Sequence, residues 1–335
     1  MLMNKLMSDR IKILNVLSTF LVVWRHSTNM VAFYGGYEHV PLVVSQTEWT
    51  LSQLTNVAVP LFFVISGFFF FRRSYYEGRS YIIMLKKKSA TLLIPFIIWN
   101  IIGCGILFVA NEIEIPHSVG EVSYGIYISD YDRVLWFVRN LMLMMLLYPL
   151  YGWVFVINRW QLYFPLLIGL TIWWIPDDCS IYSSQGWLFF LLGGMISNKL
   201  KDIFNSTIQT NYVILSLAIW IALCISCQYG GKLLEKLTII LGMISVFGLT
   251  GIIPKRIFNN LLKMSPYCFF IYVTHTFLIK ALKITVAKMY PNNEIAALLA
   301  YFLLPLITFI CLLWLGKQWK RLSPKLYGIS VGGRG

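Results

Sequence analysis

The sequence predicts an all-α membrane protein, a polytopic bundle of about ten transmembrane helices. Three observations support this fold class. Of the 335 residues, 58% are hydrophobic and 13% are charged, whereas a soluble domain carries about 25% charged residues. Apolar stretches of about 20 residues, the length that spans a bilayer, recur along the chain. Lys and Arg are concentrated in alternate connections. We therefore expect one transmembrane domain over residues 1–335.

The expected helices follow the apolar stretches in order. Basic residues precede the first stretch, as in a signal peptide, but it continues through Arg25 and His26 without a small-residue cleavage site, so we interpret it as a transmembrane helix. The second contains Ser66-Gly67, a small-residue notch that lets two helices approach closely. The fifth and sixth are short. The ten helices are expected at residues 11–34, 52–71, 89–110, 134–157, 161–176, 185–198, 211–229, 237–253, 265–287 and 295–316.

The distribution of charge predicts the topology. Most of the 28 Lys and Arg residues, and few of the 14 acidic residues, lie on the side that holds both termini and the segment Arg72 to Lys88. The positive-inside rule places this side in the cytoplasm and makes the number of helices even. The net charge of +14 is spread between apolar stretches rather than collected on one polar domain. We therefore expect a lipid bilayer, and no nucleic acid, as the partner of the basic residues.

Two connections have alternative interpretations. The outer connection from Asn111 to Arg133 is either a lid over an outward-facing site or a plain solvated connector. The inner segment contains Arg72, Arg73 and the run Lys86, Lys87 and Lys88. These residues either attract anionic lipid, which contributes roughly 1 kcal/mol per basic residue, or hold a phosphorylated donor. No P-loop accompanies the segment, so nucleotide hydrolysis has no support.

Arg25, His26 and Arg139 fall inside expected helices, where an ionisable residue is costly and often functional. Counting helical rise from the two membrane surfaces puts His26 and Arg139 at similar depth in the outer third of the bilayer. Alternatively, either arginine extends to the headgroups and His26 is a hydrogen-bonded packing residue. We favour catalysis, because desolvation and the charge of Arg25 both disfavour a protonated imidazole, and a neutral histidine can act as a general base.

Further candidates are weaker. His275, near the middle of the ninth helix, is expected either to line the same cavity or to have a buried structural role. Trp136 belongs either to an interfacial aromatic belt or to the lip of a sugar-binding site. Cys224 and Cys227 form a C-x-x-C inside an apolar helix with no second pair, so we expect no metal.

Taken together, these segments resemble the acyltransferase 3 family of bacterial inner-membrane acyltransferases, over nearly the whole chain. Each fragment is mostly apolar, and the order and spacing of all six carry the resemblance. The fragments are I-L-N-V-L-S-T-F-L-V-V-W-R-H, V-P-L-F-F-V-I-S-G-F-F-F, K-K-K-S-A-T-L-L-I-P-F-I-I-W, L-W-F-V-R-N-L-M-L-M-M-L-L-Y-P-L, G-W-L-F-F-L-L-G-G-M-I-S and S-P-Y-C-F-F-I-Y-V-T-H-T-F-L.

The resemblance implies a membrane O-acyltransferase that uses acetyl-CoA or another acyl-CoA from the cytoplasm and acylates a hydroxyl of a carbohydrate outside. It also implies a catalytic role for His26. Many members carry an arginine eleven positions before this histidine, where this chain has Asn15, and Arg10 lies nearby. Arg139 and Arg25 are expected to stabilise developing negative charge. A transporter or flippase of lipid-linked sugar is the main alternative, and no internal repeat supports it. The sequence does not indicate the oligomeric state.

Overall fold

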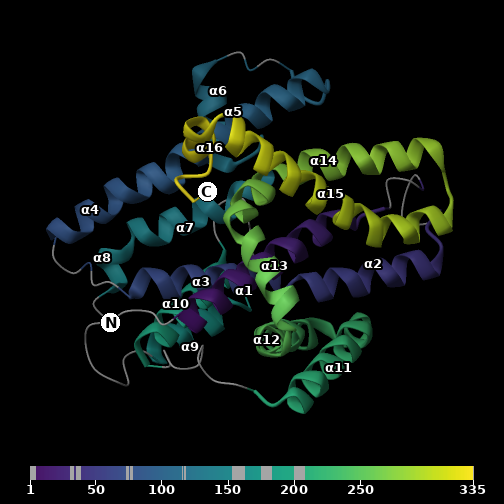
Figure 1. Cartoon of the computed structure of the whole chain (residues 1–335), viewed down its shortest axis with the longest axis horizontal. Helices are drawn as coiled ribbons and strands as arrows, with labels where there is room; N and C mark the ends of the chain where they lie inside the picture. Colours follow the sequence, from purple (N-terminus) through teal and green to yellow (C-terminus); the bar gives the residue numbers. More distant parts are fainter. Residues whose placement is uncertain are drawn as a thin grey trace. The chain divides into compact units, whose positions relative to one another are not determined.

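The computed structural model describes residues 5–30, 34, 39–72, 75, 78–114, 116, 118–152, 163–174, 183–199 and 208–334. Over these residues the chain is helical and contains no strand, from α1 (Lys5–Ser27) to α16 (Pro324–Ser330) (Figure 1). Each of the ten expected stretches is helical over most of its described length. Six helices in the described part are long and apolar enough to cross a bilayer. The all-α polytopic fold class is therefore confirmed.

The chain divides into two compact units. The first unit comprises residues 1–62 and 204–317, and the second comprises residues 63–203 and 318–335. Besides α1, the first unit contains α2 (Leu42–Thr55), α11 (Thr210–Ser226), η7 (Cys227–Tyr229), α12 (Gly231–Ile252), α13 (Lys255–Met264), η8 (Ser265–Tyr267), α14 (Cys268–Met289) and α15 (Glu294–Leu322) up to residue 317.

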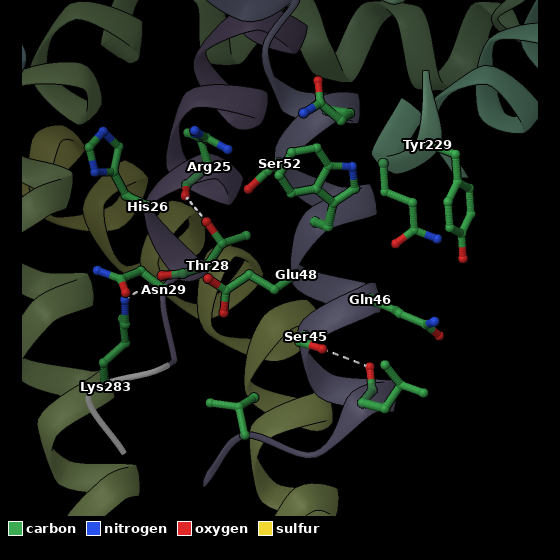
Figure 2. Close-up of a pocket in the computed structure, with 15 residues that line it drawn as sticks. Arg25, His26, Thr28, Asn29, Ser45, Gln46, Glu48, Ser52, Tyr229 and Lys283 are labelled. Atoms are coloured by element: carbon green, nitrogen blue, oxygen red, sulfur yellow. Dashed lines mark hydrogen bonds between the residues drawn. The ribbon is translucent and has the colours of Figure 1, made fainter. Parts of the chain in front are cut away.

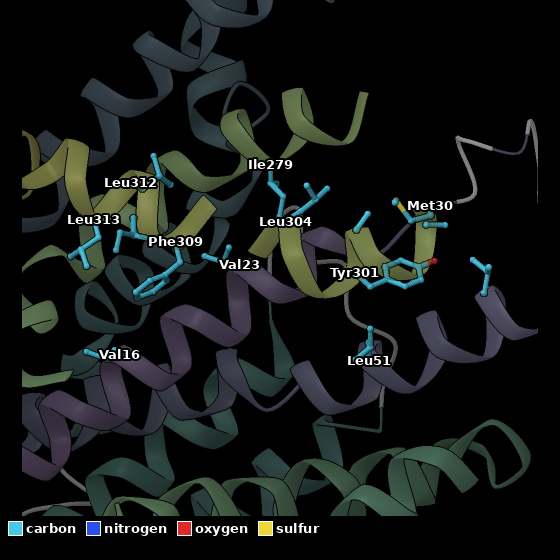
Figure 3. Close-up of a cluster of buried hydrophobic side chains, with 14 of the residues drawn as sticks. Val16, Val23, Met30, Leu51, Ile279, Tyr301, Leu304, Phe309, Leu312 and Leu313 are labelled. Carbon is cyan, nitrogen blue, oxygen red and sulfur yellow. The ribbon is translucent and has the colours of Figure 1, made fainter. Parts of the chain in front are cut away.

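Within the first unit, α1 contacts α2, α12, α13 and α14. Its side chains Val16 and Val23 belong to an apolar cluster with Leu304 and Phe309 of α15 and Ile279 of α14 (Figure 3). Helix α1 is thus enclosed by protein on several sides rather than surrounded by lipid. This packing explains how a helix with polar and charged residues is accommodated in a membrane protein, because the neighbouring helices supply partners that lipid cannot.

The second unit begins within α3 (Ala58–Phe71) and has an aromatic core in which Phe70, Phe71, Tyr148 and Phe190 pack against one another. Its other helices are α4 (Gly78–Lys88), η3 (Ser89–Leu93), α5 (Ile94–Val109), α6 (Val119–Ile128), η4 (Arg133–Leu135), α7 (Trp136–Leu146), α8 (Tyr148–Tyr151), α9 (Tyr163–Ile172), α10 (Ser184–Lys199) and α16.

The small-residue notch expected at Ser66-Gly67 is confirmed within this second unit. A Cβ built on Gly67 would lie 2.0 Å from the backbone oxygen of Phe190 in α10. The same two helices meet again at Gly193, where a Cβ would lie 2.2 Å from the oxygen of Val64. Neither position has room for a methyl group, so glycine sets the close approach of α3 and α10.

We expect Gly67→Ala to destabilise the protein by about 1–3 kcal/mol, the usual penalty for overpacking a core. The matched control is Gly105→Ala in α5, where a Cβ meets no atom within 4 Å and alanine favours the helix. Thermal unfolding of the purified proteins in detergent measures both. An unchanged unfolding temperature for Gly67→Ala, relative to the control, would contradict this packing.

The second expected helix begins ten residues earlier than the sequence suggested. Residues Leu42–Phe71 form one 30-residue stretch of helix, composed of α2 and α3 with a turn between them. The polar residues at its start favoured a loop at the sequence level. In the structure, Ser45 donates to the carbonyl of Leu42 and Thr47 to that of Val43, so their hydroxyls are satisfied one turn back along the helix.

The connection from Asn111 to Arg133 contains the short helix α6. Its start is a capping arrangement in which the hydroxyl of Ser118 accepts a hydrogen bond from the backbone N–H of Glu121, at 3.1 Å. The connection therefore has a helix of its own rather than being entirely irregular. Its role as a lid stays a prediction.

Candidate active site

Helix α1 ends at Ser27, one residue after His26, and the local sequence explains why. The hydroxyl of Thr28 donates to the carbonyl of Arg25 at 2.6 Å, and the amine of Lys283 in α14 donates to the carbonyl of Thr28. Asn29 adopts a left-handed conformation with φ of 69°, a common way for a helix to end. The last turn is therefore well satisfied, and His26 is held at the end of a buried helix.

A cavity of about 1000 Å³ lies beside this helix end, entirely within the first unit. In Figure 2, Arg25 and His26 project from the end of α1, Glu48 and Ser52 come from α2, and Lys283 comes from α14. Most of the residues that line it have polar side chains. The full set is Arg25, His26, Thr28, Asn29, Val40, Leu42, Ser45, Gln46, Glu48, Trp49, Ser52, Gln53, Gln228, Tyr229 and Lys283.

His26 is exposed to this cavity. One side of its ring faces His275 of α14, with ring centroids 4.9 Å apart and planes at 67°. His275 is completely buried, and its Nδ1 lies 2.6 Å from the carbonyl oxygen of Tyr272. Because a carbonyl only accepts, this contact assigns the proton of His275 to Nδ1. The buried Nε2 of His275 has no hydrogen-bond partner among the described residues.

His275 was expected either to line the cavity or to be buried. It is buried and is not part of the cavity lining, although it contacts the one histidine in the described residues that does line it. A direct contact between His275 and a substrate stays a prediction, and the geometry gives His275 a position behind His26.

Glu48 is a site residue that sequence reasoning missed. Its Oε2 accepts hydrogen bonds from the backbone N–H of Met30 at 2.9 Å and from the hydroxyl of Tyr301 at 2.7 Å. These bonds join α2 to the chain after α1 and to α15. The signal was present in the sequence, since Ser45, Glu48 and Ser52 follow one another at helical spacing and therefore share one face.

Lys283 was missed for a different reason. It lies near the end of the ninth expected helix, and the sequence does not show which other helix end lies beside it. In the structure it is half-buried and lines the cavity. Arg25 lies on the same cavity, and its guanidinium makes no hydrogen bond or ion pair with any residue that the structure describes.

Arg139 and Trp136 belong to the second unit. Arg139 is buried in α7, and its Nη1 donates to the carbonyl of Tyr127 in α6 at 3.0 Å. Trp136, at the start of α7, packs against the ring of Phe63. The shared depth of Arg139 and His26 stays a prediction, as do the catalytic role of Arg139 and the sugar-binding role of Trp136.

The basic segment also belongs to the second unit. Arg72 lies over the ring of Phe68, with its guanidinium carbon 5.7 Å from the ring centre. Lys86 and Lys87 are exposed in the last turn of α4, and Lys88 is half-buried. Arg73 lies outside the described residues. The exposed lysines are compatible with either lipid or phosphate groups as ligands.

The position that differs from the expected arginine, Asn15, is half-buried in α1, and its carbonyl accepts from the hydroxyl of Thr19 at 2.7 Å. Arg10 is buried at 4% exposure, and its Nη2 lies 3.2 Å from the position of a Cβ on Gly251 of α12. Glycine at this point leaves room for the guanidinium. A donor-binding role for Arg10 stays a prediction.

Comparison with known proteins was made against families, curated sequences and solved structures. The model of the family described as an acyltransferase domain, acyltransferase 3, matches residues 9–317. The chain belongs to the acyltransferase 3 family. It is also similar to the succinoglycan biosynthesis protein ExoH of Rhizobium meliloti (strain 1021), with 24% identity over 99% of this chain and 94% of the relative. No solved structure matches.

The acyltransferase 3 family consists of membrane acyltransferases. The matched region, residues 9–317, includes the residues that line the cavity and every other candidate residue discussed above. The multi-pass membrane character follows from the family together with the six long apolar helices in the described residues. The resemblance read from the six sequence fragments is therefore confirmed.

Proposed function

We propose that this protein is a membrane O-acyltransferase that moves an acyl group, acetyl in the simplest case, from acyl-CoA to a hydroxyl of an extracytoplasmic carbohydrate. The observation that carries the proposal is the position of His26 at the end of α1, exposed to a cavity of about 1000 Å³ that many polar residues line. The name of the relative ExoH, a succinoglycan biosynthesis protein, supports a polysaccharide as the acceptor.

In the proposed reaction, the hydroxyl oxygen of the sugar attacks the carbonyl carbon of the thioester. His26 takes the hydroxyl proton as the new C–O bond forms. The C–S bond then breaks, and the proton passes from His26 to the departing thiolate of CoA. His26 is thereby returned to its neutral form, as general acid–base catalysis requires.

Arg25 is the residue that we propose to stabilise the negative charge on the carbonyl oxygen during attack. It lies beside His26 on the same cavity and has five N–H donors, a fixed cation suited to an oxyanion. We assign the same kind of role to Arg139, and the phosphates of CoA to Arg72, Arg73 and the lysines of residues 86–88. Of these residues, Lys86 and Lys87 are exposed.

We propose a bacterial inner-membrane location with both termini in the cytoplasm, on the strength of the unequal distribution of Lys and Arg. The end of the first unit where α1 ends and α2 begins then faces outward, and the cavity opens toward the acceptor. The basic segment of residues 72–88 faces the cytoplasm, where acyl-CoA is made.

The proposal is tested by incubating the purified protein with radiolabelled acyl-CoA, using acetyl-CoA first, and glycans extracted from the cell surface of the source organism. We expect labelled acyl groups on the glycan, together with an equal amount of released free CoA. Movement of a lipid-linked sugar across reconstituted vesicles without any label transfer would identify a carrier instead. Mass spectrometry of the labelled glycan then identifies the acyl group and the acceptor together.

A further inference from the structure

The cavity of the first unit is lined by a second cation, Lys283, to which the proposed reaction on a neutral sugar assigns no role. Arg25 and Lys283 line it together with one acidic residue, Glu48. Within the described residues, neither cation forms an ion pair with Glu48. Counting one charge for each of these groups leaves the cavity one positive charge in excess, with His26 neutral.

The carboxylate of Glu48 already accepts hydrogen bonds from other residues. Its Oε2 accepts from both Met30 and Tyr301, at 2.9 Å and 2.7 Å. A carboxylate that accepts two hydrogen bonds through one oxygen is held in place, so it is not free to move against the two cations. The excess charge is therefore a fixed feature of the cavity.

Lys283 has donors left over. Among the described residues its amine makes one hydrogen bond, to the carbonyl of Thr28, and an ammonium has three N–H donors. The side chain reaches the cavity from α14, as Figure 2 shows. Two of its donors are available to a ligand, and their charge strengthens any hydrogen bond to an anion.

The remaining lining suits a sugar. Ser45, Gln46, Ser52, Gln53 and Gln228 offer hydroxyl and amide groups. Trp49 and Tyr229 offer aromatic faces on the same cavity. The volume of about 1000 Å³ is at the upper end of typical small-molecule sites and is larger than one sugar ring needs. Room therefore remains for a second chemical group beside the reacting hydroxyl.

We propose that this group is a carboxylate and that Lys283 is the residue that binds it. The excess of one positive charge is balanced by one negative charge, which is the charge of a carboxylate. A phosphate monoester carries about −1.5 to −2 near neutral pH, so beside Glu48 it would bring more negative charge than the excess. The carboxylate has two chemical sources, a dicarboxylic acyl group on the donor or an acidic sugar in the acceptor. This inference rests on the proposed function and specifies its substrate class.

The test compares charged and neutral substrates with the purified full-length protein. The donors are succinyl-CoA and acetyl-CoA, and the acceptor is cell-surface glycan either untreated or with its carboxyl groups reduced to alcohols. The wild type is expected to favour one charged substrate over its neutral counterpart by about 10- to 100-fold in kcat/KM, the effect of one hydrogen bond to a charged group. A preference among donors assigns the carboxylate to the acyl group, and a preference among acceptors assigns it to the sugar.

Three variants separate charge from structure. Lys283→Gln keeps a donor for the carbonyl of Thr28 but removes the charge, and it is expected to abolish the preference. Lys283→Arg keeps the charge and is expected to retain it. Lys280→Gln removes the same charge from the same helix at an exposed residue outside the cavity lining, and it is expected to behave as wild type.

The outcomes are distinguishable. Transfer by the wild type without any preference for a charged substrate overturns this inference and leaves the proposed function intact. A preference that persists in Lys283→Gln overturns the assignment to Lys283. Absence of transfer with all four combinations of donor and acceptor overturns the proposed function itself, and this inference with it.

Discussion

Replacing His26 by alanine is expected to lower acyl transfer by about 10²- to 10⁴-fold, the contribution of a positioned general base. The imidazole is exposed to the cavity at the end of α1, so its removal takes the proposed general base away from the hydroxyl of the acceptor. Mass spectrometry of cell-surface glycans, from strains that differ only in this residue, measures the loss of acyl groups.

The control is His39→Ala. His39 is also exposed, precedes α2 and is not among the residues that line the cavity. The His39→Ala variant is expected to leave glycan acylation unchanged when it is present at the same protein level as the wild type. Normal acylation in the His26→Ala strain would contradict the role of His26 as general base. If the His26→Ala variant does not accumulate in the membrane, His26→Gln is used for the same measurement.

Replacing His275 by phenylalanine is expected to lower kcat by about 10- to 100-fold with a smaller change in KM. Phenylalanine keeps a ring of similar volume, so packing is largely maintained. It removes both nitrogens of a ring that lies against His26, one of which, Nε2, has no hydrogen-bond partner among the described residues. When His26 takes the proton, it gains a second N–H, and a lone pair close by stabilises that form.

We describe His275 as a positioning residue, because it acts through His26 and is not part of the cavity lining. The dependence of kcat on pH distinguishes this role from a structural one, since a residue that only packs does not alter the titration of the base. An unchanged pH profile in His275→Phe, with kcat also unchanged, would show that the histidine serves packing alone.

The fold class and the position of His26 could be predicted because they depend on local features of the sequence. Apolar stretches predict helices through their length, and Gly67 predicts a close helix contact through its small size. Both rules concern a single helix or a single contact. His26 was identifiable for the same reason, as an ionisable residue at the end of an apolar stretch next to Arg25.

The partners of His26 could not be predicted in the same way. Glu48 lies before the helix expected at residues 52–71, yet the structure is helical from Leu42, and the hydroxyls of Ser45 and Thr47 donate to carbonyls one turn back. The contact of His275 with His26 joins residues 249 positions apart in the sequence, and helix packing alone creates it. The place of Lys283 on the cavity could not be predicted without knowing that α14 lies beside the end of α1.

The most direct test of the central claim is chemical modification of the wild-type protein. Diethyl pyrocarbonate reacts with accessible, unprotonated imidazoles, and mass spectrometry locates each modified histidine while acyl transfer is measured in the same samples. We predict that His26 is modified near pH 7, that His275 stays unmodified, and that transfer falls in proportion to the modified fraction of His26. Full transfer by protein in which His26 is completely modified would contradict the account.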